Sequence, residues 1–350
     1  MTWAKADFTC ASTRGFDPRR QTQPNTLSLR TQTKAMSTHH RDEYRTFASE
    51  VADLPLFMQP WYLDAVCPEG SWDAAVVQKN GRTVAVLPYF LKHKLAWKYV
   101  TMPKLCKQLG PFLLPEYRNL KWEMRLYREL IEQLPEQLAA FEQNFNYTVT
   151  NWLPFYWKGF KQTTQYSYTL SLEPPEELII KNIEKDYIKK INAAKARLVL
   201  RDDLPLSELH RLVRASFERQ GLKTSIDFQF LQSLYAAISE LGCGKLFFAT
   251  DPETGDLHSA ALLVWDKTSA YYLMSGDDPA SRNSGAAVLL KWAAILYAKN
   301  VVRVPIFDFE GSMIRTIEHS CREFGAQQRP YFRVRHEWSV FLKWWKFLKS

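Results

Sequence analysis

The sequence predicts a mixed α/β (α+β) architecture in two halves, each with a mixed sheet flanked by helices. The 350 residues are enough for two domains of ordinary size. Apolar residues make up 46% of the chain and charged residues 24%, which is typical of globular proteins. In both halves the pattern runs from a β-hairpin through a helix to a strand, an order typical of such sheets.

The clearest signal in the first half is Asn80-Gly81 between two β-rich runs, Trp72–Gln78 and Thr83–Phe90. Both central residues of a two-residue hairpin turn need positive φ, which asparagine and glycine adopt easily. We therefore expect a hairpin here. The other elements expected in this half are helices over Gln59–Val66, Arg118–Gln133 and Glu136–Asn144, and a strand at Tyr147–Thr150.

The second half begins with a predicted strand over Tyr166–Leu172 and a helix from Pro174-Pro175 to about Ala196. Apolar residues in that helix recur at spacings of three and four, which fits one helix face. The remaining expected strands are Val199–Arg201, Leu246–Thr250, Ser259–Trp265, Ala270–Ser275, Val304–Phe309 and Tyr331–Val334. The remaining expected helices are Leu206–Gln220, Asp227–Leu241, Gly285–Lys299 and Thr316–Phe324.

The two ends of the chain have a different character from the middle. The formal charge is +9, and residues 1–35 hold six basic and two acidic residues, so they carry +4 of it. Lacking an apolar core of about 7–15 residues, this stretch is no secretory signal, and we expect a disordered leader over residues 1–40 with Met36 as an alternative start. Residues 337–350 predict a basic aromatic helix, which would lie on an anionic membrane surface or pack on the first domain.

Cysteine and histidine usage excludes several classes. The five cysteines lie far apart with no C-x-x-C pair, and the seven histidines form no H-E-x-x-H. This argues against a disulfide framework and against a bound metal, and favours reduced thiols in the cytoplasm. No stretch approaches 18 consecutive apolar residues, so no transmembrane helix is expected.

The sharpest local feature runs from Tyr272 to Ala287, where a strand ends, small residues follow and an apolar helix begins. Free N–H groups at a helix start, together with the helix dipole, favour an anion there. The segment Arg282–Ala287 fits R-x-x-G-x-A. The alternative is an ordinary serine-capped helix with a tight entry loop. The candidate cofactor-binding residues are Ser275, Arg282, Asn283, Ser284, Gly285, Ala286 and Ala287.

This hexapeptide is similar to the pyrophosphate loop of GNAT acyltransferases, which bind coenzyme A there. Downstream, Phe307–Ser312 and Arg322–Phe332 resemble the Fem-type branch of that superfamily, and in the first half Gln59–Val66 and Gln108–Phe112 do so too. The resemblance covers about residues 45–335. It implies two tandem GNAT-like domains, at residues 41–165 and 166–336, and the transfer of an acyl or aminoacyl group to an amine.

Two departures from the Fem-type pattern favour acyl-CoA over aminoacyl-tRNA as the donor. Fem-type peptidoglycan ligases carry a lysine where this chain has Ser320-Cys321. Many of them also insert a long coiled coil that helps to hold tRNA, whereas residues 205–241 predict two short helices. The alternatives are an aminoacyl-tRNA-dependent transferase acting on a peptidoglycan precursor, and a non-catalytic member that binds a ligand.

Amide formation from a thioester needs a neutral amine, a proton acceptor and a donor for the developing oxyanion. The resemblance implies that backbone N–H groups of the strand Ala270–Ser275 serve the oxyanion. Asp308 and Glu310 are the candidates for the base or for orienting the amine, since alternate residues of an extended strand face the same side. The alternative is that these carboxylates pair with arginines and only stabilise the sheet.

The candidate substrate-binding residues are Glu318, Arg322 and Tyr331. Arg322 would meet an acidic group of the acceptor, or it would simply form an i,i+4 ion pair with Glu318. The expected partner is a small-molecule or peptide amine; tRNA is less favoured, and the chain shows no DNA-binding module. The sequence does not predict the oligomeric state.

Overall fold

The computed structural model describes residues 40–67, 71–95 and 97–339. The predicted leader therefore lies outside the described residues except for His40. The predicted C-terminal helix lies outside them beyond Ser339, and Glu337 ends the last strand. Among the helices of the described ranges, none has both the length and the apolar character needed to cross a membrane.

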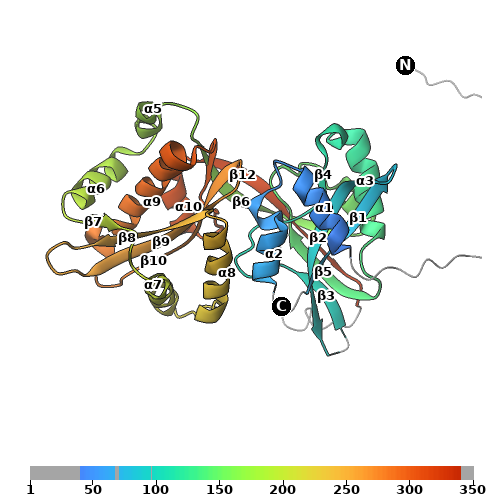
Figure 1. Ribbon diagram of the computed structural model, residues 1–350, viewed down its shortest axis with the longest axis horizontal. Coiled ribbons are helices and arrows are strands. Elements are labelled where there is room, and N and C mark those ends of the chain that lie inside the picture. Colours follow the sequence, from blue (N-terminus) through green and yellow to red (C-terminus); the bar gives the residue numbers. More distant parts are fainter. Residues whose placement is uncertain (1–39, 68–70, 96, 340–350) are drawn as a thin grey trace, which may run out of the picture. The chain divides into compact units, whose positions relative to one another are not determined.

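The first half contains four α-helices and six strands in the described part of the chain (Figure 1). The helices are α1 (Arg41–Glu50), α2 (Pro60–Val66), α3 (Leu120–Glu132) and α4 (Leu153–Trp157). The strands are β1 (Trp72–Lys79), β2 (Arg82–Lys94), β3 (Trp97–Thr101), β4 (Phe112–Leu113), β5 (Leu138–Asn144) and β6 (Lys161–Ser171).

The second half follows with six α-helices and six strands among the described residues. The helices are α5 (Glu176–Lys181), α6 (Lys185–Lys195), α7 (Leu206–Glu218), α8 (Phe228–Glu240), α9 (Ala286–Tyr297) and α10 (Arg315–Arg322). The strands are β7 (Val199–Arg201), β8 (Gly244–Thr250), β9 (Leu257–Trp265), β10 (Ser269–Asp277), β11 (Ile306–Asp308) and β12 (Gln327–Glu337).

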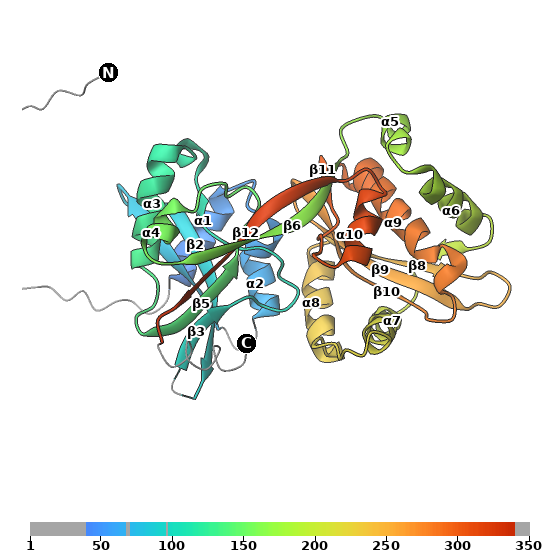
Figure 2. The same cartoon turned by 180° about the vertical axis from the view of Figure 1, so that it is seen from behind.

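All these strands belong to one mixed sheet, in the order β1-β2-β3-β5-β12-β6-β11-β10-β9-β8-β7, with β4 paired to β2. The last strand, β12, pairs antiparallel with both β5 and β6 and so joins the two halves (Figure 2). The mixed α/β fold class is thereby confirmed. The predicted domain boundary after residue 165 falls within β6, and the division into two domains stays a prediction.

The predicted hairpin is present, and its turn has the expected backbone. Asn80 has φ of 52° and Gly81 of 78°, and β1 pairs antiparallel with β2 from Trp72 opposite Phe90 onward. This turn depends on local backbone preferences, which is why the sequence alone identified it.

Two predicted elements near residue 140 are wrong. Residues 138–144, expected in a helix, form β5, which pairs with β3 on one side and β12 on the other. Helix-favouring residues are outweighed here by hydrogen bonding along both edges and by alternating burial. Residues 147–150 form a loop instead of a strand, and Asn146 Oδ1 accepts a hydrogen bond from the Thr148 N–H at 3.0 Å.

The single helix expected from Pro174 to Ala196 is divided into α5 and α6. The break lies at residues 182–184, where the Glu184 N–H donates to the carbonyl oxygen of Glu323 at 2.9 Å. That N–H is therefore used in a tertiary contact instead of a helical bond. Such a contact between residues distant in sequence leaves no mark on local periodicity.

Helices cover opposite faces of the second-half strands (Figures 1 and 2). Alternate side chains of β10 follow this division. Tyr271 and Leu273 belong to the core that includes α7 and α8, whereas Ala270 and Tyr272 belong to the core that includes α5, α6, α9 and α10. A ligand reaching β10 from one face therefore meets different side chains from a ligand reaching it from the other.

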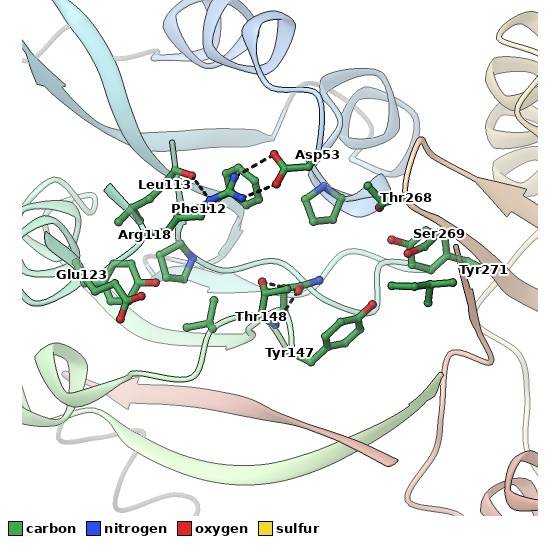
Figure 3. A pocket seen from close by; sticks show the side chains of 16 residues that line it. Asp53, Phe112, Leu113, Arg118, Glu123, Tyr147, Thr148, Thr268, Ser269 and Tyr271 are labelled. Atoms are coloured by element: carbon green, nitrogen blue, oxygen red, sulfur yellow. Dashed lines mark hydrogen bonds and ion pairs between the residues drawn. The ribbon is translucent and has the colours of Figure 1, made fainter. Parts of the chain in front are cut away.

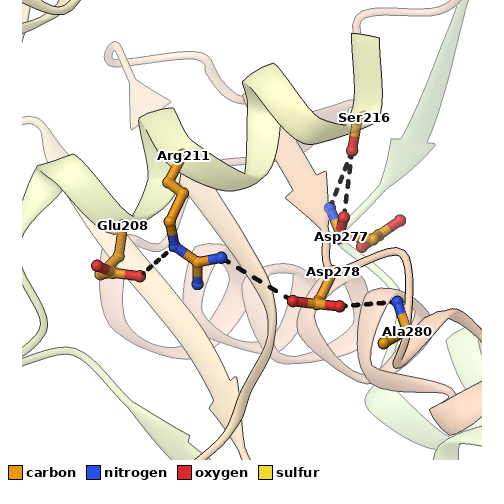
Figure 4. A network of polar contacts seen from close by, with 6 residues as sticks. All are labelled: Glu208, Arg211, Ser216, Asp277, Asp278 and Ala280. Carbon is orange, nitrogen blue, oxygen red and sulfur yellow. Dashed lines mark hydrogen bonds and ion pairs between the residues drawn. The ribbon is translucent and has the colours of Figure 1, made fainter. Parts of the chain in front are cut away.

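Helix α7 packs directly against the end of β10. A Cβ atom added at Gly276 would lie 2.4 Å from both the Leu212 carbonyl carbon and the Val213 nitrogen. The next residue is also fixed, because the Asp277 N–H donates to Ser216 Oγ at 3.1 Å (Figure 4). Only glycine leaves room for this approach of helix to strand.

The loop that follows β10 is anchored by charge. Arg211 of α7 donates to Glu208 Oε2 at 2.8 Å and lies 3.9 Å from a carboxylate oxygen of Asp278 (Figure 4). The other Asp278 oxygen accepts from the Ala280 N–H at 2.7 Å. These contacts hold the start of the segment that leads into α9.

Replacing Gly276 by alanine should lower the free energy of unfolding by about 3 kcal/mol, because the new Cβ meets rigid helix backbone instead of a movable side chain. Urea denaturation measures this. Gly221→Ala is the control: its Cβ would meet nothing within 4 Å, and only its positive φ of 69° should cost about 1 kcal/mol. Equal losses in the two variants would contradict the packing argument.

Candidate active site

Strands β10 and β11 part in the middle of the second half. They pair in parallel from Ser269 opposite Ile306 to Tyr271 opposite Asp308, and there β11 ends while β10 continues to Asp277. On its other edge, the pairing of β10 with β9 shifts register between Tyr272 and Met274. Beyond Tyr271, β10 has no strand partner on the β11 side within the described sheet. We call this place the fork.

Asp308 lies at the base of the fork and is 2% exposed. Its Oδ1 accepts hydrogen bonds from Ser167 Oγ at 2.7 Å and from the Glu310 N–H at 2.8 Å. Burial raises the pKa of Asp308 to about 6, although both hydrogen bonds and the ammonium of Lys107 act in the opposite direction. A buried carboxyl with a pKa near neutrality is suited to accepting a proton from an amine.

Glu310 is beside Asp308, but not in the way that the sequence predicted. The strand ends at Asp308, and Glu310 has the left-handed φ of 63°, so alternation along an extended strand does not place the two carboxyls. The turn brings them together through the Glu310 N–H. Burial and the neighbouring Asp308 raise the pKa of Glu310, and Lys107 opposes this. Within the described residues, no arginine forms an ion pair with either carboxylate.

Residues from both halves surround this carboxyl pair. Lys107 donates from Nζ to the Gly311 carbonyl oxygen at 2.8 Å. Burial, then Glu310 and Asp308, raise the pKa of Tyr331 to about 12, which places this predicted residue beside the pair. Burial and Asp308 also raise the pKa of Tyr147. Sequence reasoning missed Lys107 and Tyr147, because both are more than 150 residues away along the chain.

A cavity of about 260 Å³ lies at the junction of the two halves (Figure 3). Ser269, Tyr271 and Ile306 of the second half line it, together with Tyr147 of the first half. Asp308 lies two residues beyond Ile306 in the same strand, so its side chain faces the same side of the sheet. The cavity therefore lies on the same face of the sheet as Asp308, opposite α9, although neither carboxyl of the pair is among its lining residues.

The first half contributes polar groups to the same cavity. Arg118 donates from Nη2 to Asp53 Oδ1 at 3.0 Å and from Nε to the Leu113 carbonyl oxygen at 2.9 Å (Figure 3). The Arg118 guanidinium holds the pKa of Asp53 below its usual value. Glu123 and Tyr127 complete this side. A cavity with such groups suits a polar molecule.

The predicted phosphate loop has the expected position before α9. Arg282 and Asn283 are exposed, as is Ser275, and Ser284 Oγ accepts a hydrogen bond from the Ala286 N–H at 3.3 Å. Gly285 has φ of 82°. The first N–H groups of α9, which include that of Ala287, have no acceptor within the helix.

Close packing against α6 also explains why a glycine occupies position 285. A Cβ atom at Gly285 would lie 3.1 Å from Ala194 Cβ and 3.2 Å from the Lys190 carbonyl oxygen of α6. Arg197 Nη2 donates to the Ser284 carbonyl oxygen at 3.4 Å. Helix α6 therefore supports one side of the loop, and the R-x-x-G-x-A pattern serves the fold as well as any ligand.

Glu318 and Arg322 form the i,i+4 ion pair that the sequence left open, with Arg322 Nε donating to Glu318 Oε1 at 3.0 Å. Arg322 also lies 3.5 Å from a carboxylate oxygen of Glu323. With two carboxylates beside it, this guanidinium carries little uncompensated charge. The assignment of Glu318 and Arg322 to substrate binding stays a prediction, and the structure favours the ion-pair interpretation.

A lysine of α9 contacts Ser320, which stands in the sequence where the Fem-type pattern has a lysine. Lys291 of α9 donates from Nζ to Ser320 Oγ at 2.7 Å. Its Nζ also lies 5.7 Å from the ring centre of Tyr272 and 5.8 Å from that of Phe324. Sequence reasoning missed Lys291 as a functional candidate, because it compared positions along the chain and not in space.

No three His, Cys, Asp or Glu side chains of the described segments come together as a group that could hold a metal ion.

Replacing Asp308 by asparagine should change how stability depends on pH. The pKa of Asp308 is about 6 in the folded protein, against 3.8 for an unperturbed aspartate. Because this pKa is raised on folding, the wild type loses stability as the pH rises from about 4 to 7, by about 3 kcal/mol. In urea denaturation at several pH values, the variant should gain about this much over the wild type. Exposed Asp186→Asn is the control; a gain that does not vary with pH would contradict the assignment.

Comparison with known proteins agrees with this geometry. Residues 184–312, which include the loop before α9 and the carboxyl pair, match the family model described as Acetyltransferase (GNAT) domain. A search of curated protein sequences found no significant match.

Solved structures share the fold over most of the chain. The crystal structure of FemX has a TM-score of 0.63 at 13% identity, covering 83% of this chain and 95% of its own. A tandem GNAT protein from the clavulanic acid biosynthesis pathway, without AcCoA, has a TM-score of 0.53 at 14% identity, with coverages of 85% and 93%. L-PGS from Bacillus licheniformis has a TM-score of 0.51 at 10% identity, with coverages of 86% and 94%. Residues 184–312 are therefore similar to a GNAT acetyltransferase domain, and the described chain has the fold of FemX and of the tandem GNAT protein, which confirms the resemblance predicted from its motifs.

Proposed function

We propose that the protein is an N-acyltransferase that moves an acyl group from acyl-CoA to the amine of an amino acid, an amino sugar or a peptide. The observation that carries this proposal is the fork, with its buried carboxyl pair, inside the segment that matches the GNAT model. The two faces of the sheet offer separate approaches to this place. Two substrates can thus meet there without competing for one entrance.

The donor would bind on the α9 face. Its pyrophosphate would accept hydrogen bonds from the N–H groups at the start of α9, where the helix dipole favours negative charge. Exposed Arg282 lies beside this position. The free edge of β10 beyond Tyr271 would supply backbone N–H donors to the thioester carbonyl as negative charge develops on its oxygen.

The acceptor amine would enter from the cavity on the opposite face. Asp308, assisted by Glu310, would take the amine proton as the nitrogen attacks the thioester carbonyl carbon. The C–N bond forms and the C–S bond breaks, and the departing thiolate needs a proton. Tyr331 has a raised pKa of about 12, so its phenol stays protonated at neutral pH and can donate a hydrogen bond to the sulfur. The proton that Asp308 takes from the amine would pass to the departing thiolate, which is a stronger base than the carboxylate, and Asp308 would thereby return to its starting form.

Placing a carboxylate at the start of α9 tests the donor. Ala287→Glu should weaken CoA binding at least tenfold relative to Ala287→Gln, because the two side chains are matched in size and only one repels a phosphate. Isothermal titration calorimetry measures both variants. Equal affinities in the two variants would contradict the assignment of the loop. Salt-sensitive tRNA binding without CoA binding would instead favour the aminoacyl-tRNA donor.

Removing both proposed proton acceptors tests the chemistry. The double variant Asp308→Asn, Glu310→Gln should lower kcat for acyl transfer by about 10²–10⁴-fold and leave the Kd for CoA unchanged. A panel of acyl-CoAs and amines, followed by mass spectrometry, measures transfer. If the wild type binds CoA but transfers nothing to any amine, the non-catalytic ligand-binding alternative is favoured.

A further inference from the structure

Lys291 carries a charge that the protein itself does not balance. Its side chain is partly buried between α9 and α10, and its strongest contact is the neutral hydroxyl of Ser320, 2.7 Å from Nζ. The aromatic rings of Tyr272 and Phe324 also lie beside the Lys291 ammonium. Among the described residues, no carboxylate lies within ion-pair distance of this ammonium.

Two other partly buried lysines, Lys79 and Lys299, are better satisfied. Lys79 Nζ lies 2.7 Å from a carboxylate oxygen of Glu129. Lys299 donates to two backbone carbonyl oxygens, those of Leu172 at 2.6 Å and Pro174 at 2.7 Å. By contrast, burial lowers the pKa of Lys291, and the more distant Cys321 and Asp277 only partly oppose this effect. An ammonium held in such surroundings favours an anion as partner.

The position of Lys291 relates it to the fork. It lies six residues after Gly285, which is about 9 Å along a helix from the start of α9. Its ammonium lies beside the ring of Tyr272. Tyr272 directly follows Tyr271, the last residue of β10 that pairs with β11. We consider a donor with its phosphates at the start of α9 and its thioester at the fork. The acyl group of such a donor would lie near Tyr272 and Lys291.

We propose that Lys291 and Ser320 form a subsite for a carboxylate carried by the acyl group of the donor. The enzyme would then prefer acyl thioesters that end in a carboxylate over neutral ones of the same length. This inference rests on the proposed function, because it takes the acyl group to lie at the fork.

The donor pattern of the two side chains fits a carboxylate. Ser320 Oγ accepts its hydrogen bond from Lys291 and also hydrogen-bonds to the Tyr187 phenol. A bound carboxylate would replace this phenol as the acceptor for the Ser320 hydroxyl proton. An ammonium and a hydroxyl could each donate to one carboxylate oxygen, and such charge-assisted bonds are stronger than neutral ones. The thioester carbonyl already has backbone donors on β10, so it does not need this cation.

Binding of matched donors tests the subsite. Isothermal titration calorimetry with CoA, succinyl-CoA and butyryl-CoA compares acyl groups with equal numbers of carbon atoms that differ in the terminal carboxylate. The wild type should bind succinyl-CoA about tenfold more tightly than butyryl-CoA. Lys291→Met should abolish this preference and leave the affinity for CoA unchanged. Ser320→Ala should reduce the preference, and Lys291→Arg, which keeps a cation, should retain part of it.

The control variant is Lys189→Met, which removes an exposed ammonium of α6 and should keep the full preference. Thermal unfolding of each variant checks that it is folded. If the wild type binds CoA but does not distinguish the two acyl groups, or if the preference survives Lys291→Met, the subsite is wrong while the proposed donor stands. If the wild type does not bind CoA at all, both the proposed donor and the proposed subsite are wrong.

Discussion

The pairing of β12 with both β5 and β6 is the constraint on which the rest of the structure depends. It joins the last strand of the second half to two strands of the first half, because β12 returns between β5 and β6. The neighbouring pair of β6 with β11 sets Thr169 opposite Asp308, so that Ser167 of β6 reaches the buried carboxylate. Hydrogen bonding between strands, more than any single side chain, therefore determines where the acid–base groups lie.

The buried carboxyl pair shows how two halves make one site. Asp308 and Glu310 come from the second half, whereas Lys107 and Tyr147 come from the first. Lys107 opposes the rise in pKa that burial imposes on both carboxyls, so the protonation of the pair depends on a residue across the junction. A change in the contact between the halves would alter the acid–base properties of the site, even with both carboxyls in place.

The fork gives the two faces of the sheet different chemistry. One face offers a polar cavity and the carboxyl pair, and the other offers the start of α9 and the ammonium of Lys291. Alternate side chains of β10 face these two sides, so Tyr271 and Tyr272 belong to different cores although they are neighbours in the sequence. The pairing of β11 with β10 ends at Tyr271, between these two faces.

The sequence by itself determined the features that depend on local physics. The hairpin at Asn80-Gly81 follows from backbone preference, the tight loop before α9 from its small residues, and most helices and strands from periodicity. Only the tertiary structure decided that residues 138–144 form a strand, that Glu310 reaches Asp308 through a turn, and that Lys291 stands beside Ser320. These three depend on partners far away in the chain, and the free energy of such contacts leaves no pattern among neighbouring residues.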